Sequence, residues 1–146
     1  MKKGGQELVG GLDVKVIRNR YGTQIQSFVA DLQLPFLGEG ESEGEKPFRG
    51  VFIRAPVVEA VNISPSKNDG AEGTGKNVPV EVLGVYQRKP KQDAVEGGDG
   101  QADEDIVAVR QRNIFGTSFH PELTSDIRIH VWWLTQVLDA VKPQLN

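Results

Sequence analysis

Cysteine is absent from this 146-residue sequence, which also contains only two histidines. The chain can therefore form no disulfide, no thiolate metal site and no cysteine nucleophile of its own. No apolar run approaches the ~20 residues that a membrane span needs, and Met1–Lys3 is followed by glycine and polar residues rather than by the apolar core of a secretory signal. The formal net charge of −3 gives no electrostatic reason to expect nucleic acid as a partner. We therefore expect a cytoplasmic protein that binds neither nucleic acid nor membrane.

Hydrophilic segments mark out the organisation of the chain. Three of them, 38–46, 62–79 and 88–105, are rich in glycine and charge, and we predict that they are mobile insertions within one domain that spans 1–146. The first segment carries glutamates at alternate positions and could be imagined as a cation site. Alternating glycine and glutamate offers no fixed ligand geometry, however, so a solvated loop is the favoured interpretation.

Short apolar segments between the insertions predict strands. Residues 12–16 and 24–32 alternate in polarity and are separated by a turn, which predicts an antiparallel pair. The continuous apolar run 51–53 predicts a central strand that is covered on both faces. Further strands are predicted at 80–86, 106–110 and 114–116.

The C-terminal segment predicts an amphipathic helix. Capping side chains at 124–126 precede it, and Pro143 marks its end. One apolar face is predicted to be formed by Ile127, Val131, Leu134, Leu138 and Val141. His130 lies in the same helix and has no placed partner, so we expect a packing or surface residue there rather than a catalyst.

The stretch 117–123 contains the leading candidates for chemistry. Pro121 ends the strand before it, because proline has no backbone donor and a fixed φ. His120 and Glu122 then flank a rigid proline at a strand end, where side chains are commonly presented to a cleft. A histidine with a carboxylate partner forms the base and the orienting group of a nucleophilic triad. The motif alone fits a strand-end histidine bonded to its neighbours equally well.

Arg54 directly follows the apolar run 51–53. A guanidinium at the mouth of a buried strand needs a carboxylate, a phosphate or water as its partner. Judged from the residues alone, a structural salt bridge is the favoured interpretation, and a substrate contact is the alternative.

Six blocks of the sequence occur together in a single order. They are 10–14, 18–24, 27–32, 48–56, 107–111 and 116–124, the last containing Thr117-Ser118-Phe119-His120-Pro121-Glu122-Leu123. In this order the blocks resemble the glutaminase subunit of pyridoxal 5'-phosphate synthase, a class I, triad-type glutamine amidotransferase family. The long hydrophilic insertions are similar to those of fungal members. The family usually has Arg where this chain has Thr23, and Glu where it has Val29.

The resemblance implies a fold and a role for each matching position. The fold implied is a flavodoxin-like α/β three-layer sandwich, of which this chain carries mainly the C-terminal half, a mixed sheet with a C-terminal helix. His120 is implied as general base and acid, and Glu122 as the group that orients its imidazole. Arg18, Ile53 and Arg54 match positions that contact L-glutamine, which reverses the salt-bridge preference for Arg54. No metal and no cofactor are implied.

In the family that the chain resembles, a cysteine thiolate attacks the side-chain amide of glutamine, and the released ammonia passes to a separate synthase subunit. That subunit builds pyridoxal phosphate from a pentose phosphate and a triose phosphate. The cysteine elbow and a glycine-rich oxyanion loop belong to an N-terminal half that would precede Met1, and this sequence contains neither. A hydroxyl from Thr117 or Ser118 is a disfavoured substitute, because Ser118 lies nearly next to the base on a strand.

Two functional classes are therefore open. In the first, the chain belongs to a glutaminase that supplies ammonia for vitamin B6 synthesis. In the second, it is a catalytically inactive fragment or an interaction module that binds the synthase subunit. A half-sheet without its neighbouring strands leaves an apolar edge exposed, which predicts aggregation or obligate pairing.

Overall fold

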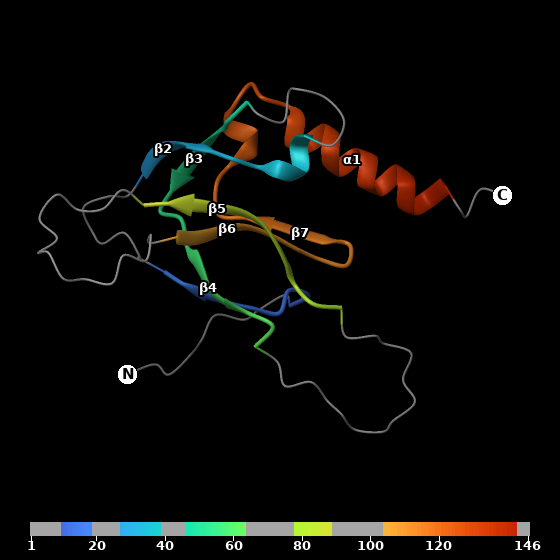
Figure 1. Cartoon of the computed structure of the whole chain (residues 1–146), viewed down its shortest axis with the longest axis horizontal. Helices are drawn as coiled ribbons and strands as arrows, with labels where there is room; N and C mark the ends of the chain where they lie inside the picture. Colours follow the sequence, from blue (N-terminus) through green and yellow to red (C-terminus); the bar gives the residue numbers. More distant parts are fainter. Residues whose placement is uncertain (1–9, 19–26, 39–45, 64–77, 89–103, 143–146) are drawn as a thin grey trace, which may run out of the picture.

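The computed structural model describes residues 10–18, 27–38, 46–63, 78–88 and 104–142. The elements of this part are β1 (Val14–Ile17), β2 (Ser27–Leu32), η1 (Pro35–Gly38), β3 (Phe48–Ile53), β4 (Val57–Val61), β5 (Glu81–Gln87), β6 (Glu104–Gln111), β7 (Ile114–Thr117), η3 (Pro121–Leu123) and α1 (Arg128–Val141). Figure 1 shows α1 at one side of the strands, next to η1. Among the described helices, none is long and apolar enough to cross a membrane.

The larger sheet is built around β6. Its strand order is β1-β4-β6-β5, and β7 also pairs with β6. Val107, Ala108 and Val109 of β6 are consecutive and all buried, as expected for a strand that is covered on both faces. A two-residue turn, in which Arg112 has a φ of 55°, leads from β6 into β7. The strands predicted at 80–86, 106–110 and 114–116 are confirmed. All pairings among the described strands are antiparallel.

The predicted pairing of the first two strands is wrong. β1 pairs with β4, in a register from Val14↔Val61 to Ile17↔Val57. β2 pairs with β3 in a separate two-stranded sheet, from Ser27↔Ile53 to Leu32↔Phe48. Alternating polarity identifies a strand but not its partner, which depends on the side chains that meet across the sheet. The turn on which the prediction rested, within 19–26, lies outside the described residues.

A cluster of aromatic side chains joins the small sheet to the larger one. Phe52 of β3 stacks on Phe28 of β2 with ring centroids 4.6 Å apart, and its ring lies 5.8 Å from that of Tyr86 in β5. Phe119 lies 5.7 Å from Phe48 and 5.8 Å from Phe52. Each such pair contributes about 0.5–1.5 kcal/mol beyond its buried area. The residue that precedes His120 is therefore fixed in the core.

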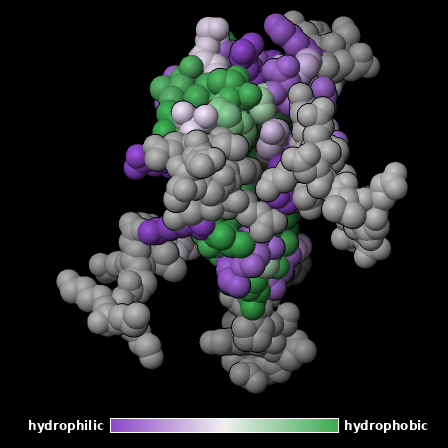
Figure 2. Space-filling model, turned by 90° about the vertical axis from the view of Figure 1, so that its left-hand side faces the viewer, coloured by the Kyte–Doolittle hydropathy of each residue, from purple (hydrophilic) through white to green (hydrophobic). Residues whose placement is uncertain are grey.

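The prediction that residues 51–53 form a strand covered on both faces is also wrong for this structure. Burial alternates along β3, with Phe48, Gly50 and Phe52 buried and Ile53 exposed. Val29 of β2 lies on the same open face, since it is opposite Val51. Figure 2 shows hydrophobic residues gathered in the upper part of this side of the molecule, where Figure 1 places β2 and β3. In the apolar run 51–53, Phe52 therefore faces the core, whereas Val51 and Ile53 form an apolar face that is not covered.

The C-terminal helix forms as predicted, but its buried face differs. The N-cap residue is Ile127, which forms no side-chain cap bond, and Asp126 just before it accepts a hydrogen bond at Oδ1 from the amide of Arg128 at 3.1 Å. Ile129 is 3% exposed and anchors the helix to the core, whereas the five residues predicted to form the apolar face are all exposed. Pro143 lies outside the described residues.

The three predicted insertions fall mostly outside the described residues, at 39–45, 64–77 and 89–103. Some residues at the ends of these segments are described. β6 begins at Glu104, and the neighbouring Asp105 is 4% exposed and forms an ion pair with Arg88 at 3.1 Å. Glu104 and Asp105, which the sequence assigned to the third segment, therefore belong to β6.

Candidate active site

His120 and Glu122 form a hydrogen-bonded pair at the end of β7. The Nδ1 atom of His120 lies 2.7 Å from Oε1 of Glu122. Their side chains are 42% and 58% exposed, so the pair is open to solvent in this chain. A distance of 2.7 Å is typical of a charge-assisted hydrogen bond between an imidazole and a carboxylate.

The protonation state of the pair follows from the carboxylate. The pKa of Glu122 is held below its usual value, first by a hydrogen bond from its own backbone amide, then by His120, with a smaller contribution from the nearby His130. Glu122 is therefore ionised at neutral pH and can only accept, so Nδ1 of His120 donates. In a neutral imidazole this leaves Nε2 as the acceptor, which is the arrangement that a general base requires.

The backbone around the pair is fixed by the core and by β3. The amide of His120 donates a hydrogen bond of 2.8 Å to the carbonyl of Val51. Immediately after it, Pro121 begins the short helix η3, and Thr124 closes the turn by donating from its amide to the Pro121 carbonyl at 3.4 Å. Phe119, directly before His120, is buried in the core. The backbone of the pair is therefore fixed before His120 by the core and after Glu122 by the turn that Thr124 closes.

The predicted substrate residues converge on the link between β3 and β4. Ile53 is the last residue of β3, and Arg54 follows with a φ of 44°. Arg18 follows β1, whose last residue, Ile17, pairs with Val57 at the start of β4. The register therefore brings Arg18 to the same link. Strand β3, which leads into this link, is connected to His120 because the carbonyl of Val51 accepts a hydrogen bond from the His120 amide. A positive φ at a non-glycine residue such as Arg54 is uncommon, and such residues cluster at functional sites.

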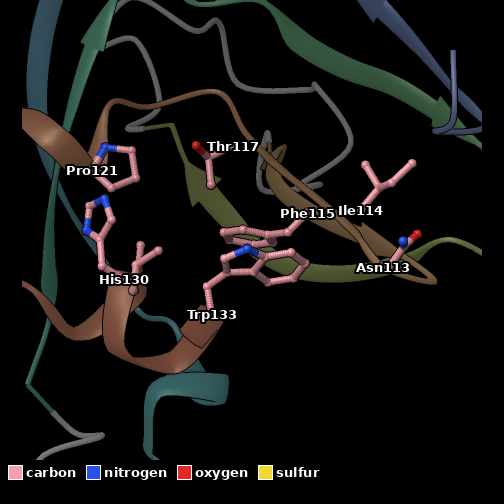
Figure 3. A pocket seen from close by; sticks show the side chains of 8 residues that line it. Asn113, Ile114, Phe115, Thr117, Pro121, His130 and Trp133 are labelled. Atoms are coloured by element: carbon pink, nitrogen blue, oxygen red, sulfur yellow. The ribbon is translucent and has the colours of Figure 1, made fainter. Parts of the chain in front are cut away.

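An open groove of about 420 Å³ reaches Pro121, the residue between His120 and Glu122, although neither His120 nor Glu122 lines it. It is lined by Asn113, Ile114, Phe115, Thr117, Pro121, Ile129, His130 and Trp133. Figure 3 shows His130 of α1 next to Pro121, and Trp133 against Phe115, with ring centroids 5.8 Å apart. Sequence reasoning disfavoured Thr117 as a nucleophile and His130 as a catalyst, and it assigned no site role to the other lining residues. The available sequence signal was that His130 lies in the first turn of the helix that follows the 117–123 stretch.

The hydroxyl of Thr117 and the backbone of Ser118, both near His120, are engaged in local structure. Thr117 Oγ1 donates a 2.8 Å hydrogen bond to the carbonyl of Phe119. The amide of Ser118 donates to the carbonyl of Val107 at 2.8 Å. This arrangement agrees with the sequence argument against a hydroxyl nucleophile, since the Thr117 hydroxyl is bonded to the backbone.

An imidazole oriented by a carboxylate at the end of a strand is the arrangement in which the base of a nucleophilic triad is held. Comparison with known proteins identifies the family of the chain. It belongs to the SNO glutamine amidotransferase family, whose model matches residues 3–89 and 76–139. A solved structure described as a glutamine amidotransferase is 36% identical, with a TM-score of 0.52, over 86% of this chain and 46% of that one. The α/β amidotransferase fold expected from the sequence is thereby confirmed.

Curated relatives are of the kind that the resemblance suggested. A probable pyridoxal 5'-phosphate synthase subunit of Arabidopsis thaliana is 42% identical over 91% of this chain and 49% of its own length. The pyridoxal 5'-phosphate synthase subunit PdxT of Thermotoga maritima is 37% identical over 94% of this chain and 53% of its own. The chain thus spans about half the length of the curated relatives that it matches.

Proposed function

We propose that this chain supplies the His–Glu half of a glutaminase site, which delivers ammonia to a synthase subunit for pyridoxal 5'-phosphate synthesis in the cytoplasm. The observation that carries the proposal is the 2.7 Å contact between Nδ1 of His120 and an ionised Glu122. Membership of a glutamine amidotransferase family gives the class of reaction. The relatives named as pyridoxal 5'-phosphate synthase subunits suggest where the ammonia goes.

The proposed reaction assigns a task to each group. A thiolate, from a part of the protein beyond this sequence, attacks the side-chain carbonyl carbon of L-glutamine. His120 gives a proton to the departing nitrogen, so ammonia leaves and a glutamyl thioester remains. His120 then removes a proton from water, which attacks the thioester and releases glutamate and the thiol. Glu122 holds the imidazole in the required tautomer throughout.

Binding of glutamine is proposed to involve the β3–β4 link. Arg18 and Arg54 place positive charge there, and a guanidinium is suited to pair with the α-carboxylate of an amino acid. Ile53 is exposed beside them and is available to contact the aliphatic part of the substrate. These three roles come from the family resemblance, and the register of β1 against β4 supports their common location.

An interaction module without catalysis is the second candidate. The absence of cysteine from this sequence and the exposed apolar faces of β2–β3 and α1 favour it. In this case the chain binds the synthase subunit and releases no glutamate from glutamine.

A single sample separates the two candidates. The endogenous protein is purified, its mass and N-terminal peptide are determined by mass spectrometry, and glutamate release from L-glutamine is measured with and without the synthase subunit. We expect a product longer than this sequence, with activity that His120→Asn abolishes. A native product of 146 residues that binds the synthase subunit but releases no glutamate would establish the interaction module instead.

A further inference from the structure

The peptide unit between Phe119 and His120 is bonded at both of its polar groups. Its amide, that of His120, donates to the carbonyl of Val51 in β3 at 2.8 Å. Its carbonyl, that of Phe119, accepts a hydrogen bond of 2.8 Å from Oγ1 of Thr117. A peptide unit is planar, so bonds at both of its groups fix the direction in which the chain enters His120. That direction sets where the imidazole leaves the backbone.

These two bonds lie where the chain changes its hydrogen-bonding partner. Strand β7 ends at Thr117, and the amide of Ser118 still donates to β6, at the carbonyl of Val107. Two residues later the amide of His120 is bonded to β3 instead. The carbonyl of Phe119 lies between these two connections, in a residue that is 2% exposed. A buried carbonyl needs a donor, and here the donor is a side chain rather than a strand.

The simpler interpretation of the Thr117 hydroxyl is that it only satisfies this carbonyl. The exposure of the His120–Glu122 pair argues for more. The two side chains are 42% and 58% exposed, so few neighbours limit their rotamers, yet Nδ1 and Oε1 lie 2.7 Å apart. The geometry of the pair therefore depends on its backbone, and a misplacement of about 1 Å can lower the rate of an enzyme by about 10²-fold.

Substitution can remove one of the bonds that fix the backbone of His120. The carbonyl of His120 accepts from the amide of Leu123 at 3.2 Å, and the amide of His120 donates to the carbonyl of Val51. Both of these bonds join main-chain groups, so they remain whatever side chains are present. The bond to the Phe119 carbonyl comes from the Thr117 side chain, and a single change of that residue breaks it.

We propose that Thr117 is a positioning residue for His120, and that its hydroxyl holds the Phe119–His120 peptide unit in the orientation that brings the imidazole onto Glu122. The proposal rests on the proposed function, because it takes His120 as the base. It assigns Thr117 no contact with glutamine, and it is separate from the role of nucleophile that the sequence disfavoured.

The test makes four variants of the complete native protein and assays them with the synthase subunit present. Thr117→Val keeps the branched shape and removes the donor, Thr117→Ser keeps the donor and removes the methyl group, and Thr117→Ala removes both. Thr135→Val is the matched control, because Oγ1 of Thr135 donates to the carbonyl of Val131 at 2.9 Å within α1. The measurements are kcat and KM for glutamate release, the unfolding midpoint, and the ¹⁵N chemical shifts of the His120 side chain.

Thr117→Val is expected to lower kcat by about 10–100-fold and to leave KM within about twofold, because the proposed glutamine contacts lie on the β3–β4 link. Thr117→Ala is expected to follow it, which also answers the question if Thr117→Val does not fold. Thr117→Ser should stay within about threefold of the parent, and Thr135→Val should not differ from it. The proposal is overturned if Thr117→Val and Thr117→Ala keep the parent kcat, if Thr117→Ser loses as much as they do, or if the control loses as much.

The chemical shifts of the His120 nitrogens report its position directly. A carboxylate held at Nδ1 selects one tautomer of the neutral ring, in which the two nitrogens differ strongly in shift. His120→Asn identifies the signals. Loss of the Thr117 hydroxyl is expected to move them toward a mixture of the two tautomers. A merely structural role of Thr117 would lower the unfolding midpoint and leave these shifts where they are in the parent, and this result would refute the proposal.

The same two measurements separate this proposal from the proposed function. A complete protein that releases no glutamate from L-glutamine, but whose His120 shifts respond to Thr117→Val, refutes the proposed function and leaves the positioning role in place. An active protein whose kcat and shifts are insensitive to loss of the Thr117 hydroxyl refutes the positioning role and leaves the function in place.

Discussion

Arg128 connects the start of α1 to the strand that lies beside His120, and its removal tests how the site is supported. Its Nε lies 3.0 Å from both carboxylate oxygens of Asp126, and Nη2 lies 2.7 Å from Oδ2. Nη1 and Nη2 also donate to the carbonyls of Lys46 and Pro47, at 2.9 and 3.1 Å, directly before β3. The guanidinium carbon lies 5.8 Å from the centre of the Phe48 ring.

The change Arg128→Met removes the charge and all five donors but keeps an apolar stem near Phe48. The side chains of Arg128 and Asp126 are only 17% and 24% exposed, so screening by water is incomplete. The charge-assisted pair accounts for about 1.5–3 kcal/mol. The two carbonyl bonds add less than about 1 kcal/mol together, because Lys46 and Pro47 are exposed and water can replace the donor. We expect the free energy of unfolding to fall by about 2–4 kcal/mol at pH 7.

The pH dependence of this loss has a definite sign. The pKa of Asp126 is lowered from its usual value of 3.8, chiefly by the hydrogen bond from the Arg128 side chain. A carboxyl group whose folded pKa is depressed stabilises the protein above its unfolded pKa, and the contribution disappears as the pH falls through the folded value. The difference between parent and Arg128→Met should therefore be constant above about pH 5 and shrink below about pH 4.

Urea denaturation followed by the fluorescence of Trp132 and Trp133 measures both effects, since both rings pack on Phe115. Lys142→Met is the matched control, because its ion pair with Asp139 is exposed and should contribute less than about 0.5 kcal/mol. A loss below about 1 kcal/mol for Arg128→Met at pH 7, or a loss that persists unchanged at pH 3, would show that the pair does not support the fold as argued.

Three further predictions concern the site and its support. Phe119→Ala should lower the free energy of unfolding by about 3–5 kcal/mol, and Phe119→Leu by clearly less, in the same urea assay; equal losses would mean that the ring is not packed as described. Gly84→Ala should cost about 1–3 kcal/mol, because the added Cβ would lie 2.6 Å from Leu34 Cδ2, and an unchanged midpoint would contradict the close approach. In the assembled enzyme, Glu122→Gln should lower kcat for glutamine hydrolysis by about 10²–10⁴-fold without shifting the unfolding midpoint, and full activity would remove Glu122 from the mechanism.

The sequence predicted most of the local structure but not how the strands combine. Alternating polarity located β1 and β2 correctly within a few residues, yet their partners are β4 and β3. Pairing is decided by contacts between residues far apart in the chain, such as the stack of Phe28 on Phe52, and no local pattern reports these. The proline between His120 and Glu122 was a local signal, and the geometry of that pair was accordingly predictable.

The groove was not predicted either, because it also depends on contacts between residues that are far apart in the chain. Trp133 and Phe115 come from different elements, and only the tertiary fold brings them together. The helical spacing of 127–141 correctly predicted an apolar stripe, but it did not show whether this stripe faces the core. The stripe that the sequence assigned to the core is exposed. Ile129, Trp132 and Trp133 indicate the buried face more reliably, because large aromatic and apolar side chains gain most from burial.

The surfaces that disagree with the sequence-based expectations have one physical explanation in common. A helix with apolar residues on two faces and a strand with an apolar open face, such as β3 at Val51 and Ile53, carry the composition of elements buried on both sides. The chain also holds His120 and Glu122, the proposed base and its orienting carboxylate, whereas this sequence contains no thiol. Apolar faces without a cover and a base without a nucleophile both point to the half of the relatives' length that this chain does not match. The same additional half would bury the faces and complete the site, so assembly and catalysis are expected to appear together.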